Sequence, residues 1–311
     1  MRIVFMGTPE FAVPSLAALL DAGYEVVGVF TQPDRPSGRG GKLSACPVKQ
    51  LAVSRGLRVC QVEKIRRADG LELLRELSPD LCVTAAFGQI LSQANLDVPP
   101  LGTVNVHASL LPKYRGAAPI NWCILMGEDE AGVTTMYTDA GIDTGDMLLA
   151  EKTPIGPEET AGELTARLSQ MGARLLIRTL QAIEQGTCPR IKQNPDEATH
   201  QPMLDKQMGL MDFAQDAQAL ARKVRGLNPW PGTYAALPEG MLKVWKAHAV
   251  EGDFGGVPGQ IVVSDGKDGL IVACGAGALQ LDEIQAPAAK RMDAKAYLRG
   301  KVLPIGMVLN G

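Results

Sequence analysis

Short apolar runs alternate with segments of helical periodicity along the first half of the chain. The apolar runs have the character of buried strands, and they are RIVFM at 2–6, EVVGVF at 25–30, LRVC at 57–60, DLCVTAA at 80–86 and TVNVH at 103–107. The segments PSLAALLDAG, PVKQLAVSRG and GLELLREL between them are predicted helices. Strands buried on both faces and alternating with helices predict an α/β fold with a doubly wound, mostly parallel, Rossmann-like sheet. Ligands of such a sheet bind outside the carboxyl ends of its strands.

The pattern changes after residue 187. A long predicted helix, ETAGELTARLSQMGARLLIRTLQAIEQG, is followed by a polar, aperiodic, proline-containing segment at 188–206, which is typical of a linker. One further helix then precedes five short β patterns, which are TYAAL, LKVWKAHAV, GQIVVS, GLIVACG and ALQLDEIQ. Five strands of this size favour a small OB-like β-barrel. We therefore predict an α/β domain over 1–187, a linker over 188–206 and a second domain over 207–311.

Composition narrows the possible partners only slightly. A chain of 311 residues with 21% charged residues and a net charge of -3 is an ordinary globular sequence, long enough for two domains. Since no apolar run approaches the roughly 18 to 20 residues that span a bilayer, we expect a cytoplasmic chain without membrane contact. The acidic balance argues against a general nucleic-acid binder. Residues 206–311, however, hold 12 Lys and Arg against 10 Asp and Glu.

Several common site types are excluded by spacing. The six cysteines are scattered without C-x-x-C, which favours buried free thiols, and the three histidines show no metal-ligand spacing, so no metal is expected. GTPEF lacks the glycines of a dinucleotide fingerprint. In SGRGGKL, Pro36 replaces the first glycine of a phosphate loop and Leu43 follows the lysine. The acidic turn DAGIDTGD lacks the alternating oxygens of a calcium loop.

One polar pair stands at the carboxyl end of a predicted strand. Asn105 and His107 are at i and i+2, so their side chains share a face of the strand. An amide N–H and a protonated imidazole N–H can both stabilise an oxyanion that develops on a carbonyl carbon. A nearby carboxylate would raise the basicity of the histidine and relay a proton, and Asp143 is the candidate. This chemistry needs no Ser or Cys nucleophile; the alternative is a core strand whose Asn and His satisfy one another.

These residues resemble the signature of a known family. Asn105, His107, SLLPKYRG from Ser109 to Gly116 and the IDTG around Asp143 resemble the folate-dependent formyltransferases, which move a formyl group from 10-formyltetrahydrofolate to an amine. Within that family, FTQPDRPSGRGGKL at 30–43 and NPWPGTY at 228–234 resemble the members that formylate initiator methionyl-tRNA and so support translation initiation. The resemblance covers nearly the whole chain.

The resemblance implies a role for each motif residue. Asn105 and His107 would hold the formyl oxygen in the tetrahedral intermediate, while Asp143 would orient His107 and help to remove the proton of the amine. Four backbone positions would line the folate site: Ser109, Leu110, Leu111 and Pro112. Phe11 would help to form the pocket for the methionine side chain. Residues 207–311 would bind tRNA, and a monomer is expected.

The loop at 31–49 would be the insertion that grips the acceptor end of the tRNA. The resemblance places Arg39 and Lys42 against phosphate or the first bases. The loop carries four basic groups and one acid, with Pro or Gly at six positions, so we expect irregular structure that can mould to a polyanion. Without the resemblance, a solvated surface loop would be the simpler interpretation.

Two features depart from the family pattern or stay ambiguous. The segment 199–213 keeps only Lys206 where the family often has several basic residues, so the resemblance does not extend to linker contacts with tRNA. Trp230 and Trp245 are interpreted as core or hinge packing rather than as a base-stacking platform.

Other functions remain as alternatives. A formyltransferase for the amine of a sugar nucleotide can share these motifs but does not explain the basic loop. Glycinamide ribonucleotide formyltransferases usually lack a second domain. A binding protein that has lost its chemistry would not need Asn105, His107 and Asp143.

Overall fold

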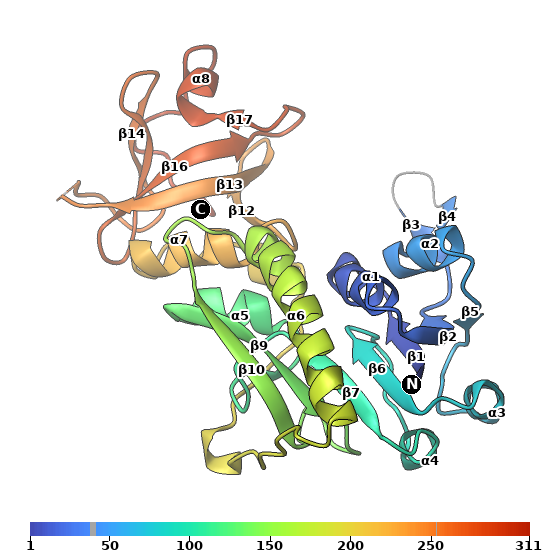
Figure 1. Cartoon of the computed structure of the whole chain (residues 1–311). Helices are drawn as coiled ribbons and strands as arrows, with labels where there is room; N and C mark the ends of the chain where they lie inside the picture. Colours follow the sequence, from blue (N-terminus) through green and yellow to red (C-terminus); the bar gives the residue numbers. More distant parts are fainter. Residues whose placement is uncertain (38–41, 253) are drawn as a thin grey trace. The chain divides into compact units, whose positions relative to one another are not determined.

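The computed structural model describes residues 1–37, 42–252 and 254–311 (Figure 1). Two compact units account for the chain. The first consists of Met1–Pro119, Ala131–Thr153 and Thr165–Gln201. The second consists of Ile120–Glu130, Pro154–Leu164 and Pro202–Gly311. The domain boundaries predicted from the sequence stay a prediction.

A seven-stranded sheet organises the first unit. Its strands in spatial order are β10 (Met147–Pro154), β9 (Glu130–Tyr137), β7 (Thr103–His107), β6 (Leu81–Ala85), β1 (Arg2–Gly7), β2 (Glu25–Thr31) and β5 (Val59–Gln61). The five strands from β7 to β5 pair in parallel, and β9 pairs antiparallel with β7. The predicted doubly wound α/β sheet is therefore confirmed. Strand order reverses between β1 and β6, which is where ligands of such sheets bind.

Helices cover both faces of this sheet. They are α1 (Val13–Asp21), α2 (Pro47–Ser54), α3 (Ala68–Leu77), α4 (Gln93–Leu96) and α6 (Ala161–Glu184), with the short 3-10 helices η1 (Glu10–Ala12) and η2 (Pro195–Glu197). On one face, Leu74 and Leu77 of α3 pack with Met6 and Phe30. On the other, α6 lies along β7 and β9 (Figure 1). The polar residues of the central strands are thus accessible only near the strand ends.

Two short ladders join loops in this unit. β3 (Arg35–Ser37) pairs antiparallel with β4 (Lys42–Ser44), and β8 (Arg115–Gly116) pairs in parallel with β11 (His200–Gln201). The expectation of irregular structure at 31–49 was therefore wrong for β3 and β4, since backbone N–H and C=O groups in a loop form a ladder where the chain folds back on itself. The segment at 188–206 likewise contributes β11.

An antiparallel sheet forms the second unit, where the sequence predicted a small OB-like β-barrel domain of five strands. Its strands in spatial order are β12 (Thr233–Leu237), β13 (Gly240–Val250), β16 (Ala278–Gln285), β15 (Gly269–Ala273) and β14 (Ile261–Asp265), and β17 (Met292–Asp293) pairs with β16. All five predicted strands are present. Helices α5 (Pro119–Met126), α7 (Ala217–Gly226) and α8 (Ala294–Leu298) and the 3-10 helix η3 (Gln207–Gly209) complete it.

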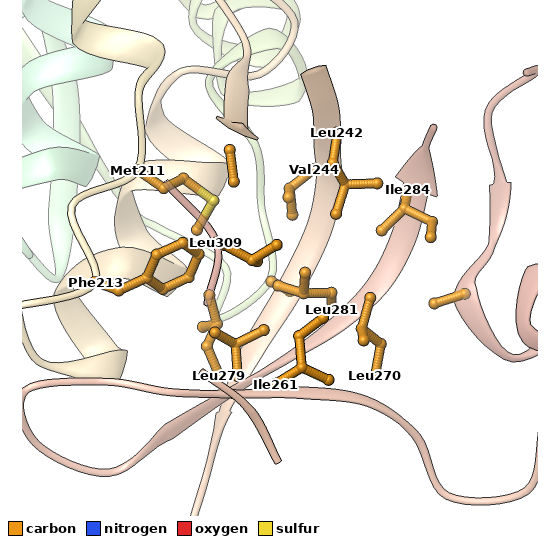
Figure 2. Packing of buried hydrophobic residues seen from close by; sticks show 14 of the residues in the cluster. Met211, Phe213, Leu242, Val244, Ile261, Leu270, Leu279, Leu281, Ile284 and Leu309 are labelled. Carbon is orange, nitrogen blue, oxygen red and sulfur yellow. The ribbon is translucent and has the colours of Figure 1, made fainter. Parts of the chain in front are cut away.

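The core of the second unit includes side chains from strands whose residues alternate between a buried and an exposed face. Along β13, Leu242 and Val244 are buried while Met241 and Lys243 are exposed, because successive side chains point to opposite faces. Figure 2 shows these side chains converging with others from the sheet. The remaining labelled members are Met211, Phe213, Ile261, Leu270, Leu279, Leu281, Ile284 and Leu309.

The cysteines are free, and most are buried. Cys60, Cys82, Cys123 and Cys274 are buried, while Cys46 and Cys188 are half-buried. Burial raises the pKa of the Cys82 thiol to about 12. The prediction of free, mostly buried thiols is confirmed. In the part of the chain that the structure describes, no helix has both the length and the apolar character to cross a membrane.

Candidate active site

Asn105 is fixed by a neighbour on the adjacent strand. Thr84 of β6 is its register partner, so both side chains lie on the same face of the sheet. The Thr84 hydroxyl donates to Asn105 Oδ1 at 2.8 Å. Because this bond occupies the amide oxygen, the NH₂ group faces Asp143, with Nδ2 at 3.5 Å from Oδ1 of the carboxylate. Asn105 therefore presents a donor at the carboxyl end of β7.

His107 is buried, with only 7% of its surface exposed. Its Nε2 is 3.0 Å from the backbone oxygen of Tyr114, and since a carbonyl only accepts, Nε2 carries the hydrogen. Its Nδ1 is 3.6 Å from Oδ2 of Asp143. In a neutral ring Nδ1 would be a lone pair facing a carboxylate, whereas a protonated ring makes an ion pair there. Nδ1 is thus the ring atom at which a proton can be exchanged.

Asp143 lies in the turn between β9 and β10 and contacts both partners. The backbone N–H of Gly116 donates to its Oδ2 at 2.8 Å, and its side chain is 18% exposed. Asp143 has a φ of +53° and Tyr114 one of +57°, a region that non-glycine residues enter at a cost. The two residues that hold His107 are therefore held in place by the surrounding structure. The structure brings Asn105, His107 and Asp143 together, whereas the sequence named Asp143 only as a candidate partner for the other two.

The segment predicted to line the folate site directly follows β7. Thr134 of β9 donates its hydroxyl to the Ser109 oxygen at 2.7 Å and accepts from Leu111 N at 3.2 Å. Ser109 and Leu111 are buried, whereas Leu110 and Pro112 are half-buried. Thr134 therefore fixes the backbone of this segment beside the site. Its contact with folate stays a prediction.

The remaining predicted residues are placed less completely. Phe11 lies in η1 with 8% of its surface exposed, and its backbone oxygen accepts from Ser169 Oγ of α6 at 2.8 Å. Arg39 lies outside the described residues. The backbone of Lys42 begins β4, and its side chain is outside what the structure describes. Their roles toward methionine and tRNA stay predictions.

The other two basic residues of the 31–49 loop are paired with carboxylates. Lys49 Nζ lies 2.5 Å from Asp34 Oδ2 and donates to Gln61 Oε1 at 2.8 Å. The hydrogen bonds from Lys49 and Gln61 hold the pKa of the Asp34 carboxyl below its ordinary 3.8. Arg35 lies 3.7 Å from Glu63. Arg39 and Lys42 are therefore the two basic residues of the loop for which contact with tRNA is predicted.

The two tryptophans differ in exposure. Trp245 on β13 is half-buried, and the guanidinium of Arg291 stacks 4.9 Å from its ring centroid. The packing interpretation thus holds for Trp245. It was wrong for Trp230, which is 54% exposed because it stands in the proline-flanked turn before β12 and not on a strand that alternates toward the core.

Sequence reasoning missed the residues that support the site. Thr84 could have been found, because a hydroxyl near the carboxyl end of an apolar strand is unusual and lies at the predicted ligand edge. Thr134 is fully buried in β9, the β pattern that the sequence places before the Asp143 loop, but its contacts with Ser109 and Leu111 had no signal in the sequence. Gln193, which contacts the Asp143 turn, lies in an aperiodic polar segment that carried no signal.

Comparison with known proteins settles the family. Residues 1–180 match the formyl transferase family, and residues 203–302 match its C-terminal domain. The chain is 50% identical over 309 residues to the methionyl-tRNA formyltransferase of Citrifermentans bemidjiense, covering 99% of this chain and 96% of that one. It belongs to the methionyl-tRNA formyltransferase family. A methionyl-tRNA formyltransferase of Acetivibrio thermocellus is 48% identical over 99% of both chains, and the predicted resemblance to a formyl-transferring enzyme is confirmed.

Solved structures more distant from this family share the fold. An N-formyltransferase from Helicobacter canadensis, in complex with folinic acid and dTDP-3-aminofucose, superposes with a TM-score of 0.68 at 19% identity, over 94% of this chain and 100% of that one. HypX from Aquifex aeolicus, in complex with tetrahydrofolic acid, gives a TM-score of 0.64 at 17% identity, over 96% of this chain and 47% of that one. At these identities the likeness concerns the fold alone.

Proposed function

We propose that this enzyme transfers the formyl group of 10-formyltetrahydrofolate to the α-amine of initiator methionyl-tRNA, and so supports translation initiation. One observation supports methionyl-tRNA as the substrate. The chain is close to 50% identical, over almost its whole length, to proteins named methionyl-tRNA formyltransferase. Solved sugar N-formyltransferases share the fold at 17–20% identity, so they give the alternative of a sugar-nucleotide substrate no comparable support. Folate complexes of two fold relatives support the donor.

Asn105 and His107 stabilise the oxyanion in this proposal. Attack of the amine on the formyl carbon places negative charge on the formyl oxygen, and fixed N–H donors stabilise such charge strongly in a buried site. The Asn105 amide already presents its NH₂ group, because Thr84 occupies the oxygen. His107 supplies the second donor through Nδ1 when its ring is protonated, since Nε2 is bonded to the Tyr114 carbonyl.

Asp143 takes part in the proton transfer that completes the reaction. The bond from the amine nitrogen to the formyl carbon forms, the bond from that carbon to the folate nitrogen breaks, and a proton leaves the amine and is delivered to the folate nitrogen. Oδ2 of Asp143 and Nδ1 of His107 are 3.6 Å apart, so the two groups can pass that proton. An aminoacyl amine with a pKa of roughly 8 or lower does not demand a strong base.

The hydrogen bonds of His107 do not suggest a covalent mechanism with a serine or cysteine nucleophile. Among the described residues, the ring nitrogens of His107 contact a carbonyl and a carboxylate, so no serine or cysteine is bonded to this base. The Ser109 hydroxyl donates to the Lys113 backbone oxygen at 2.7 Å. Direct attack by the substrate amine is therefore the reaction that this arrangement supports.

The other contacts extend this proposal. Arg39 and Lys42 contact the acceptor end of the tRNA, and Phe11 lines the methionine pocket. The segment from Ser109 to Pro112 lines the folate site. Residues 207–311 form the tRNA-binding domain, in which 12 Lys and Arg of residues 206–311 outnumber 10 Asp and Glu. We expect the protein to act as a monomer.

A substrate panel tests the proposed function. Radiolabelled 10-formyltetrahydrofolate is offered with initiator methionyl-tRNA, an amino-sugar nucleotide or glycinamide ribonucleotide, and uncharged tRNA serves as the matched control. Label is expected in methionyl-tRNA alone. Equal or greater transfer to the sugar nucleotide would establish the alternative substrate instead.

A further inference from the structure

The segment predicted as a linker is built into the active site. Ile191 exchanges two backbone hydrogen bonds with Met147 of β10, at 2.8 and 2.9 Å. Further along, the Thr199 hydroxyl accepts from Tyr114 N at 2.8 Å, and its backbone oxygen accepts from Arg115 N at 2.9 Å. The segment is therefore tied both to the strand after the Asp143 turn and to the residues beside Gly116.

Gln193 lies between these two anchors and holds the Asp143 turn. Its Nε2 donates to the backbone oxygens of Asp143 and Gly145, each at 2.8 Å. Its Oε1 accepts from Nε of Arg115 at 3.0 Å. Both amide hydrogens and the amide oxygen are thus used, so the orientation of the Gln193 side chain is determined.

The Asp143 turn needs such support. A φ of +53° at Asp143 is costly for a residue with a Cβ, and it persists only where the surroundings hold the backbone. Gln193 binds the backbone of the turn, while Gly116 N binds the Asp143 carboxylate at 2.8 Å. Arg115, which is only 7% exposed, precedes Gly116 and bonds to Gln193. These contacts hold both the backbone and the carboxylate of Asp143.

We propose that Gln193 is a positioning residue for formyl transfer, which acts by holding Asp143 at the distance from His107 that the reaction requires. The proposal rests on the proposed function, because it concerns the same site. The hydrogen bonds of the Gln193 side chain go to Asp143, Gly145 and Arg115, so it acts through the Asp143 turn. A small displacement of a catalytic group lowers the rate of a step without weakening substrate binding.

Replacement of Gln193 by glutamate separates this role from a merely structural one. Glutamate keeps the shape and accepts from Arg115 as an ion pair, but it has no hydrogens for the two backbone oxygens and sets a negative charge against them. Gln193→Ala loses all three contacts. Gln181→Glu is the matched control, because Gln181 is exposed on α6 and the charge change is identical.

The test measures kcat, the KM of each substrate and the melting temperature of the three variants in the full-length enzyme. We expect kcat to fall about 100-fold in Gln193→Glu and Gln193→Ala, with both KM values unchanged in Gln193→Glu, and the melting temperature is used to show that each variant remains folded at the assay temperature. Gln181→Glu should match the wild type. Wild-type kcat in Gln193→Glu, or a change confined to KM, would overturn the proposal.

A second measurement keeps the inference testable if the proposed function fails. Hydrogen exchange is followed in a peptide covering residues 139–147. Exchange should accelerate in Gln193→Glu and stay at the wild-type rate in Gln181→Glu. Absence of methionyl-tRNA formylation by the wild type would refute the proposed function, whereas unchanged exchange would refute the positioning role.

Discussion

At the scale of single residues, the chemistry depends on hydrogen bonds that orient two side chains. The Asp143 carboxylate, which only accepts, faces the NH₂ end of the Asn105 amide, and the hydroxyl of Thr84 donates to the oxygen at the other end. The carbonyl of Tyr114 fixes which nitrogen of His107 carries a hydrogen. Neither Thr84 nor Tyr114 would bind substrate through these contacts. Each contact nevertheless affects whether Asn105 or His107 presents a donor or an acceptor to the substrate.

Thr84→Val should lower kcat because it removes this orientation while keeping the shape of the side chain. The Asn105 amide oxygen then loses the Thr84 donor and the amide is held less firmly, which weakens oxyanion stabilisation. We expect a loss of about 10-fold to 100-fold, less than the roughly 10²- to 10³-fold effect of removing such a donor. Thr84→Ser should retain most of the activity. Equal kcat in the valine and serine variants would contradict this role.

Asp34→Asn should destabilise the protein in a pH-dependent manner. The pKa of Asp34 lies below its ordinary 3.8 in the folded protein, since Lys49 and Gln61 donate to it. Its contribution is therefore present at neutral pH and is lost as the pH falls below that value. The melting temperature of the variant should lie below that of the wild type at pH 7, and the difference should shrink as the pH falls below 3.8. A constant difference across this range would show that the charge of Asp34 is not responsible.

The proposed catalytic residues could be predicted from the sequence, whereas among their supports only Thr84 left a signal, and the contacts of the supports could not be predicted. Asn105 and His107 share a strand face by local geometry alone, and the structure places Asp143 at 3.5 Å and 3.6 Å from them. The contacts of Thr84 and Gln193 depend on strand register and on the path of a segment without periodicity. Such long-range contacts leave no pattern in a single sequence.

At the scale of helices and strands, the elements with a clear apolar periodicity were predicted from the sequence. β9 and β10 are the two β patterns that the sequence places around Asp143. β9 buries Thr134 and Thr135, and the hydroxyls of Thr135 and Thr179 satisfy each other at 2.8 Å. α5 was missed. The helix α5, PINWCILM, is apolar throughout and so lacks the contrast of an amphipathic helix.

Gly172→Ala should disturb the strand that carries the catalytic pair. A Cβ at Gly172 of α6 would lie 2.8 Å from Cγ1 of Val106, which stands between Asn105 and His107 on β7. Overpacking of this kind costs about 1–3 kcal/mol of unfolding free energy.

Val106→Ala makes room for the added methyl group and supplies the control. In a double-mutant cycle measured by denaturant unfolding, the pair should cost less than the sum of the single changes. Additive effects would mean that α6 and β7 do not meet at this point.

At the scale of the whole molecule, a net charge of -3 conceals a basic loop at 31–49, which we propose contacts tRNA. The loop at 31–49 has four basic groups, but Lys49 and Arg35 lie beside carboxylates. Local distribution therefore matters more than total charge for the proposed binding of tRNA.

Arg39→Ala should weaken binding of methionyl-tRNA and reduce its salt dependence. If Arg39 contacts one phosphate, the slope of log Kd against log salt should fall by about one unit. Donor affinity should not change. Arg75→Ala on α3, which removes an exposed charge far along the sequence from the loop, is the control. If the slope of log Kd against log salt changed equally in both variants, the loop would have no special role in binding tRNA.

The most direct test of the central claim is single-turnover formylation of initiator methionyl-tRNA by the wild type and Asp143→Asn. Asparagine keeps an oxygen for the Gly116 N–H but removes the charge that faces His107. We predict that the transfer rate falls by about 10²- to 10⁴-fold while tRNA binding and the melting temperature stay at wild-type values. A rate in Asp143→Asn equal to that of the wild type would contradict the claim that Asp143 and His107 carry the proton of the reaction.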